Sequence, residues 1–283
     1  MPPDRYTTLI APEDLRTHLD LGDWALVDCR FALPDPPAGR RAYLESHIAG
    51  AVYAHLDEDL SGPIVKGKTG RHPLPAVSTI ASKLGTWGID RETQVVVYDA
   101  SGGGMAGRLW WLLRWLGHDR VAVLDGGWQA WIAAGNPVSS AAETREPRVF
   151  VPHLRPELAM DAVAVDRVRT DRQWRVFDAR SAERFRGESE TIDPVAGHIP
   201  GAVSLPYADN LTPEGRFRSP EELRARFAAA MGAVAADHVV CYCGSGVTAV
   251  HDLLAMAHAG LGEAKLYPGS WSEWITDPER PTT

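Results

Sequence analysis

The sequence contains two copies of one pattern, and this repeat limits the folds open to the chain. Three pairs of segments match: LVDCR at 26–30 with VFDAR at 176–180, SHIAGAVYAHL at 46–56 with GHIPGAVSLPY at 197–207, and residues 94–131 with residues 238–274. The members of each pair lie roughly 150 residues apart, which is the length of one ordinary domain. We therefore predict a tandem duplication with domains at 1–140 and 159–283, joined by a Pro-rich, polar linker at 141–158.

Within each half, short apolar runs typical of buried strands alternate with helical patterns. In the first half the expected strands include 25–30, 94–99 and 121–127, and the expected helices include 11–20, 76–85 and 105–117. This alternation is typical of βα units, so we predict an α/β fold in which each domain has a mainly parallel sheet with helices on both faces. Ligands of such folds bind at the carboxyl ends of the strands.

One strand of the second half ends in a candidate nucleophile. The run VVCYC reaches Cys243, Gly244 and Gly246 follow, and a helical pattern begins near Thr248. Two glycines let the chain turn sharply enough for several N–H groups to converge, and the helix N-terminus adds its dipole. Together these favour the thiolate form of Cys243, which is the nucleophilic form.

A free cysteine is more often a small buried apolar residue than a nucleophile. Core packing alone, however, gives no reason for two glycines directly after Cys243. The matching position in the first half is Asp99, so we expect cysteine chemistry only in the second half.

Composition excludes several classes of function. A net charge of −8 argues against binding to nucleic acid or to an anionic membrane surface, and no apolar run approaches the length of a membrane span. Three cysteines cannot form a disulfide framework, and the pair Cys241 and Cys243 has no partner group with metal-ligand spacing. The N-terminus MPPDRYTTLIAPEDL lacks the features of a secretory signal, so we expect a cytoplasmic protein.

These residues resemble the two-domain rhodanese family. The paired D-x-R and H-I-x-G-A-V motifs, the D/P-G-x-W motif near the end of each repeat and the loop C-G-S-G-V-T-A carry the resemblance over nearly the whole chain. It implies a sulfurtransferase that carries sulfur as a persulfide on Cys243, with no metal or organic cofactor. The N–H groups of the loop, which include those of Gly244, Gly246, Val247 and Thr248, would hold the thiolate and the outer sulfur.

Within the family, the loop resembles the branch that takes sulfur from 3-mercaptopyruvate. In thiosulfate-using members the two residues after the cysteine are typically basic, whereas here they are Gly244 and Ser245. The resemblance also implies a small-molecule sulfur donor and an acceptor such as a small thiol, thioredoxin or cyanide.

The resemblance further implies the residues that hold and protonate the donor. Arg184, in the motif R-F-R-G, would bind the donor carboxylate, while the second arginine of the animal enzymes is missing from 188–193. Arg186 or a basic residue of the first domain could replace it. Ser245, His72 and Asp57 would deliver a proton to the leaving enolate, although Asp59 fits a slightly shifted alignment in place of Asp57.

Three alternatives stay open at this point. A thiosulfate:cyanide sulfurtransferase differs from the favoured function only in its donor. A phosphatase or arsenate reductase of this fold would need an arginine six residues after the cysteine, where this chain has Ala249. A non-enzymatic sulfur-binding module is disfavoured by the intact loop around Cys243. The sequence decides neither the donor, nor the acceptor, nor the oligomeric state.

Overall fold

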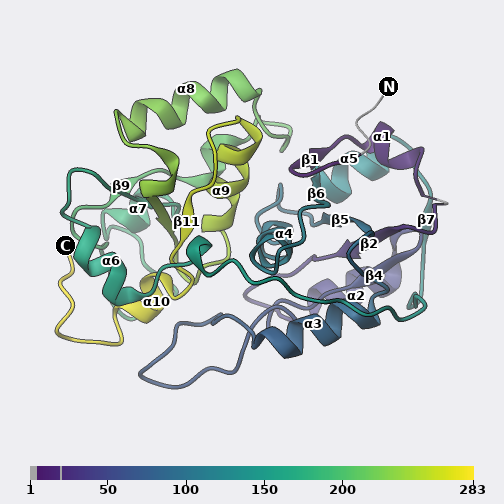
Figure 1. Ribbon diagram of the computed structural model, residues 1–283, viewed down its shortest axis with the longest axis horizontal. Coiled ribbons are helices and arrows are strands. Elements are labelled where there is room, and N and C mark those ends of the chain that lie inside the picture. Colours follow the sequence, from purple (N-terminus) through teal and green to yellow (C-terminus); the bar gives the residue numbers. More distant parts are fainter. Residues whose placement is uncertain (1–4, 20) are drawn as a thin grey trace. The chain divides into compact units, whose positions relative to one another are not determined.

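The computed structural model describes residues 5–19 and 21–283, and these form two compact units (Figure 1). The first unit contains residues up to Ser61, Pro75–Arg155 and Pro213–Arg216. The second contains Gly62–Leu74, Pro156–Thr212 and Phe217–Thr283. The segment Gly62–Leu74 therefore packs with the second unit although it lies in the first half of the sequence.

The first unit is built on a five-stranded parallel sheet with the order β1-β6-β5-β2-β4. Its strands are β1 (Leu9–Ile10), β2 (Trp24–Asp28), β4 (Ala51–Tyr53), β5 (Gln94–Tyr98) and β6 (Val121–Leu124). A separate antiparallel pair joins β3 (His47–Ile48) to β7 (Val138–Ser139). The central strands β2 and β5 are buried along their whole length, which explains their nearly continuous apolar sequences WALVD and QVVVY.

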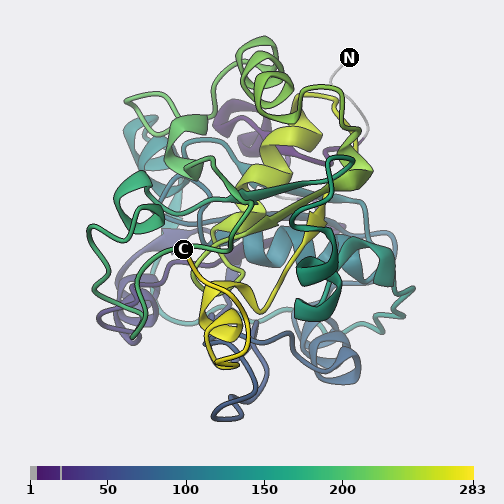
Figure 2. The same ribbon diagram turned by 90° about the vertical axis from the view of Figure 1, so that its left-hand side faces the viewer.

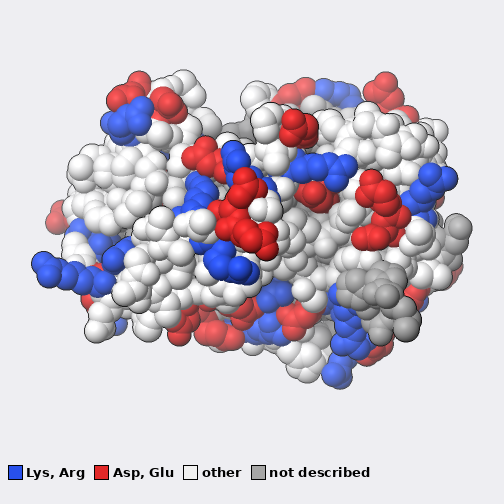
Figure 3. Space-filling view, turned by 90° about the horizontal axis from the view of Figure 1, so that it is seen from above, with Lys and Arg blue, Asp and Glu red and all other residues white. Residues whose placement is uncertain are grey.

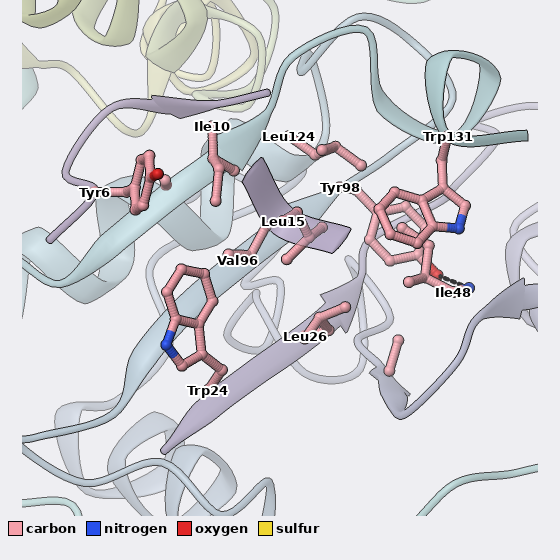
Figure 4. Close-up of a cluster of buried hydrophobic side chains, with 12 residues drawn as sticks. Tyr6, Ile10, Leu15, Trp24, Leu26, Ile48, Val96, Tyr98, Leu124 and Trp131 are labelled. Atoms are coloured by element: carbon pink, nitrogen blue, oxygen red, sulfur yellow. Dashed lines mark hydrogen bonds between the residues drawn. The ribbon is translucent and has the colours of Figure 1, made fainter. Parts of the chain in front are cut away.

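Helices cover both faces of this sheet. They are α1 (Pro12–Arg16), α2 (Ala38–Glu45), α3 (Val77–Thr86), α4 (Ala106–Trp115) and α5 (Gly127–Ala133). Figure 1 shows α1 and α5 on one side of the strands and α2 and α3 on the other. Figure 4 shows part of the core, in which large side chains such as Trp24, Tyr98 and Trp131 pack around the strands.

The second unit has a four-stranded parallel sheet with the order β11-β10-β8-β9. Its strands are β8 (Arg175–Asp178), β9 (Val203–Ser204), β10 (Val239–Tyr242) and β11 (Lys265–Leu266). Its helices are α6 (Ala162–Val168), α7 (Ala182–Phe185), α8 (Pro220–Met231), α9 (Ala249–His258) and α10 (Ser270–Trp274), with short 3₁₀ turns at η1 (Pro156–Leu158), η2 (Tyr207–Asn210) and η3 (Ala236–His238). Figure 2 shows the green α8 and yellow-green α9 above the strands and the yellow α10 below them.

The repeat seen in the sequence is also a repeat of contacts. In the first unit, the Arg30 side chain donates to the buried Asp28 carboxylate and lies over the Trp128 ring. In the second unit, Arg180 makes the same bonds to Asp178 and lies over the Trp271 ring. The D-x-R motif is therefore a buried ion pair in both units.

A second contact recurs in the same way. The N–H of Ile48 donates to the Tyr98 hydroxyl at 3.1 Å, and the N–H of Ile199 donates to the Tyr242 hydroxyl at 3.1 Å. The prediction of two tandem α/β domains, each with a parallel sheet and flanking helices, is thus confirmed. In the described part of the chain, no helix is long and apolar enough to cross a bilayer.

Candidate functional site

The Cys243 loop lies at the carboxyl end of β10, in the middle of the second sheet. Cys243 directly follows the strand, and α9 begins at Ala249, so the strand, tight loop and helix have the order predicted from the sequence. Gly246 has φ +75°, and a Cβ atom there would lie 2.1 Å from the carbonyl oxygen of Pro268. Only glycine fits this position, because any side chain would push the loop away from Pro268.

Residues of α10 hydrogen-bond to the backbone at the start of the loop. The Ser270 hydroxyl accepts the N–H of Cys243 at 3.1 Å, and the carbonyls of Cys243 and Gly244 accept the N–H groups of Trp271 and Ser272 at 3.0 and 2.9 Å. These bonds fix two peptide units at the start of the loop. Within residues 5–19 and 21–283, the N–H groups of Gly244, Ser245, Val247 and Thr248 donate to no protein acceptor.

The matching loop of the first unit shows what such N–H groups bind. The buried Asp99 carboxylate accepts the N–H groups of Ser101, Gly103, Met105 and Ala106, at 2.8, 2.9, 2.6 and 2.8 Å. The first unit therefore fills its own anion-binding loop with a side chain. In the second unit, Cys243 stands at that position and brings no carboxylate to the N–H groups of its loop.

The three cysteines have different environments. Burial raises the pKa of Cys29 and of Cys241 well above the ordinary value, and nearby Asp252 raises that of Cys241 further. Both are therefore inert as nucleophiles at neutral pH. Cys243 is the cysteine that lies beside open N–H groups and a helix N-terminus.

Two guanidinium groups approach the loop at Gly244. The position that a Cβ of Gly244 would take lies 2.8 Å from Arg71 Nη2 and 3.5 Å from both Nη atoms of Arg184. Arg184 was predicted from the R-F-R-G motif. Arg71 was missed, although its place directly before His72 in GRHPLP is a signal that could have identified it.

His72 contacts the loop serine. Its Nδ1 lies 2.7 Å from the Ser245 hydroxyl oxygen, and both side chains are buried. The backbone N–H of Arg71 donates to the Ser272 hydroxyl at 3.1 Å, which anchors the segment Gly62–Leu74 beside the loop. The fold thus brings together Cys243, Ser245, His72 and Arg184 as the sequence analysis expected.

Comparison with known proteins identifies this arrangement. A family model for the rhodanese-like domain matches residues 11–134 and again residues 162–277. The chain is a two-domain member of the rhodanese family. The resemblance inferred from the sequence is therefore confirmed.

Named relatives of this rhodanese are sulfurtransferases. The probable 3-mercaptopyruvate sulfurtransferase of Pseudomonas aeruginosa is 48% identical over 96% of this chain and 96% of its own length. The bovine thiosulfate sulfurtransferase is 34% identical over 88% of this chain and 84% of its own. Among solved structures, the 3-mercaptopyruvate sulfurtransferase from Leishmania major superposes with a TM-score of 0.86 at 33% identity, over 99% of this chain and 77% of that one.

Arg186 and Asp57 were also expected at this rhodanese site. The Arg186 guanidinium is exposed and pairs with the Glu188 carboxylate at 2.8 Å. Asp57 lies in the first unit, where burial raises the pKa of its carboxyl. Asp59, the alternative to Asp57, pairs with Lys83 at 2.7 Å and accepts the N–H of His55, so its carboxylate already has partners in the first unit.

Charge around the rhodanese fold is mixed. On the face in Figure 3, acidic and basic side chains alternate without an extended basic area. Among the residues that the structure describes, no group of three or more His, Cys, Asp or Glu side chains could hold a metal ion. The side chains at the Cys243 loop are a thiol, two guanidinium groups and a hydroxyl–imidazole pair.

Proposed function

We propose that this rhodanese is a sulfurtransferase that takes sulfur from 3-mercaptopyruvate onto Cys243 and passes it to a thiol or to cyanide, releasing pyruvate. The observation that carries the proposal is the loop from Cys243 to Thr248, whose side chains carry no positive charge and in which the N–H groups of Gly244, Ser245, Val247 and Thr248 donate to no acceptor in the described part of the chain. Such a loop stabilises a thiolate and a persulfide without also attracting a second negative charge on the donor.

The donor carboxylate fits between Arg71 and Arg184. Arg71 Nη2 and Arg184 Nη1 donate to no acceptor in the described part of the chain, and both face Gly244. Guanidinium groups bind carboxylates through paired, charge-assisted hydrogen bonds. We infer that Arg71 takes the place of the second arginine that the sequence lacks at 188–193.

Sulfur transfer then proceeds in two displacements. The Cys243 thiolate attacks the donor sulfur, an S–S bond forms, and the C–S bond breaks with its electron pair moving to carbon. This leaves the enolate of pyruvate, which needs a proton at carbon. In the second step the acceptor thiolate, or cyanide, attacks the outer sulfur and the Cys243 thiolate is released.

Ser245 and His72 are suited to supply that proton. A hydroxyl hydrogen-bonded to an imidazole transfers a proton readily because the imidazole can replace it from the other side. Asp57 stays a proposed third member of this group. Gly246, Val247 and Thr248 complete the loop that holds the sulfur.

Two other functions have less support. A thiosulfate donor is the second candidate, because the bovine relative carries that name. Phosphate-ester chemistry would need an arginine at the position of Ala249, which begins α9 and is fully buried. We further propose a small thiol or thioredoxin as the acceptor and the cytoplasm as the location, since the mechanism needs reduced thiols.

A comparison of donors tests the proposal. We expect kcat/KM to be higher for 3-mercaptopyruvate than for thiosulfate when both are measured with cyanide as acceptor. Intact-mass measurement after donor treatment should show one added sulfur. A higher kcat/KM for thiosulfate would overturn the donor assignment, and no added sulfur with either donor would overturn the sulfurtransferase itself.

A further inference from the structure

Two buried carboxylates form ion pairs with the arginines of the proposed donor site. Glu190 accepts from Arg184 Nε at 3.0 Å and from Arg184 Nη2 at 2.9 Å. Asp193 accepts from Arg184 Nη2 at 3.1 Å and also forms a close ion pair with Arg71. Their side chains are 3% and 2% exposed, so they belong to the interior of the site.

Glu190 and Asp193 bind Nη1 of Arg71 and both Nε and Nη2 of Arg184. Arg71 Nη2 and Arg184 Nη1 lie beside Gly244 and keep their donors for another group. The turn that carries the acids is ordered by one of them, because Glu190 accepts the N–H groups of Ile192 and Asp193 at 2.9 and 3.0 Å. Although burial alone would raise it, these bonds and Arg184 hold the pKa of Glu190 below its ordinary value.

The charges of the cluster cancel. The positive groups are Arg71, Arg180 and Arg184, and the negative groups are Asp178, Glu190 and Asp193. An uncompensated pair of arginines would attract a dianion about twice as strongly as a monoanion, because Coulomb energy is proportional to the product of the charges. A neutral cluster removes this advantage of the dianion while keeping the hydrogen bonds that recognise a carboxylate.

We propose that Asp193 and Glu190 determine donor specificity by cancelling the charge of Arg71 and Arg184, so that the site accepts a monoanionic 2-oxo acid thiol and disfavours dianionic thiosulfate. This inference rests on the sulfur-transfer function proposed above. It assigns the choice of donor to two acids behind the arginines as well as to the uncharged loop. Neither acid touches the donor, so both are specificity-determining residues that act through the guanidinium groups.

The test uses variants that keep shape and remove charge. Asp193→Asn and Glu190→Gln should each raise the ratio of kcat/KM for thiosulfate to kcat/KM for 3-mercaptopyruvate by about tenfold, through a lower KM for thiosulfate. Added salt should reduce this gain, because the effect is electrostatic. Glu188→Gln is the matched control, since the exposed Glu188 pairs with Arg186, and it should leave the ratio unchanged.

Two further measurements make the outcome decisive. Asp193→Glu keeps the charge and should keep the wild-type ratio of the two kcat/KM values. If the role of Asp193 were purely structural, this variant would lose activity with both donors. Asp193→Asn and Glu190→Gln would overturn the inference if each lowered kcat/KM equally for the two donors while the midpoint of thermal unfolding stayed unchanged. The mass gain on Cys243 is read in the same samples, so that a failure of sulfur loading in the wild-type protein is attributed to the proposed function and not to these acids.

Discussion

The Ser245 hydroxyl oxygen lies 2.7 Å from Nδ1 of His72, across 173 residues of sequence. Mercaptopyruvate leaves as an enolate that needs a proton, whereas thiosulfate leaves as sulfite, which needs none. This contact should therefore matter for one donor and not for the other.

Ser245→Ala separates the two donors. The change should lower kcat for 3-mercaptopyruvate by about 10²- to 10⁴-fold, the range for a lost acid–base group, and leave thiosulfate turnover within about a few-fold. Steady-state kinetics with both donors provides the measurement. Equal losses for both would mean that Ser245 only shapes the loop.

Cys243→Ser should abolish sulfur transfer while the protein still folds, because the thiolate is the proposed nucleophile. Cys241→Ser is the matched control two residues away, within β10 and fully buried. It should keep most activity, since burial and Asp252 raise the pKa of Cys241. Intact-mass spectrometry after donor treatment should show one added sulfur in Cys241→Ser and none in Cys243→Ser; a gain in the latter would assign the sulfur to another residue.

Arg71→Ala tests the residue that the sequence analysis missed. Loss of a charge-assisted bond to the donor carboxylate is worth about 1.5–3 kcal/mol, so kcat/KM should fall by roughly 10- to 150-fold, as it should in Arg184→Ala. Arg186→Ala, on the exposed pair with Glu188, should change it by less than about twofold. A wild-type value in Arg71→Ala would return the role of second arginine to Arg186 or another base.

Asp252 predicts a dependence of stability on pH. Its carboxyl is buried, Oδ1 accepts from Asn210 Nδ2 at 2.7 Å, and Oδ2 has no partner within the described ranges. Burial raises its pKa to about 7, against the opposing effect of Arg226. In the unfolded chain the carboxyl ionises near pH 4, so between about pH 4 and 7 only the folded state holds the proton.

The contribution of Asp252 to the free energy of unfolding is thus fully present below about pH 4. It falls by up to about 4 kcal/mol as the pH rises through 7. Asp252→Asn cannot ionise and should remove this loss. Urea unfolding at pH 5 and pH 8 gives the comparison, with the exposed Asp23→Asn as control. The pH dependence of Asp252→Asn would equal that of the wild-type protein if Asp252 were ionised throughout.

Sequence alone predicted the parts of this site that depend on local order. The strand, the two glycines and the helix around Cys243 are neighbours in the chain, so residue type and spacing were enough to place them. The same holds for Asp99, which the repeat aligns with Cys243.

Arg71 could not be placed in this way. It lies in a loop of the first half of the sequence that packs with the second unit. Hydrophobic periodicity predicts helices and strands and does not predict which unit a loop joins. The acids Glu190 and Asp193 looked like ordinary loop charges, because a sequence does not distinguish a solvated carboxylate from one that is buried against a guanidinium. Their role follows from burial and distance.

The bonds of Asp99 also show which stabilising contact the Cys243 loop lacks. One copy of the fold closes its loop with a carboxylate of its own, while in the other the matching N–H groups of Ser245 and Val247 donate to no acceptor in the described residues, and we propose that they bind the donor sulfur. Buried donors without acceptors lower the stability of a fold, so the Cys243 loop should stabilise the second unit less than the Asp99 loop stabilises the first. On this proposal, the duplication separates two tasks that a single domain would have to combine: stability in one half and substrate binding in the other.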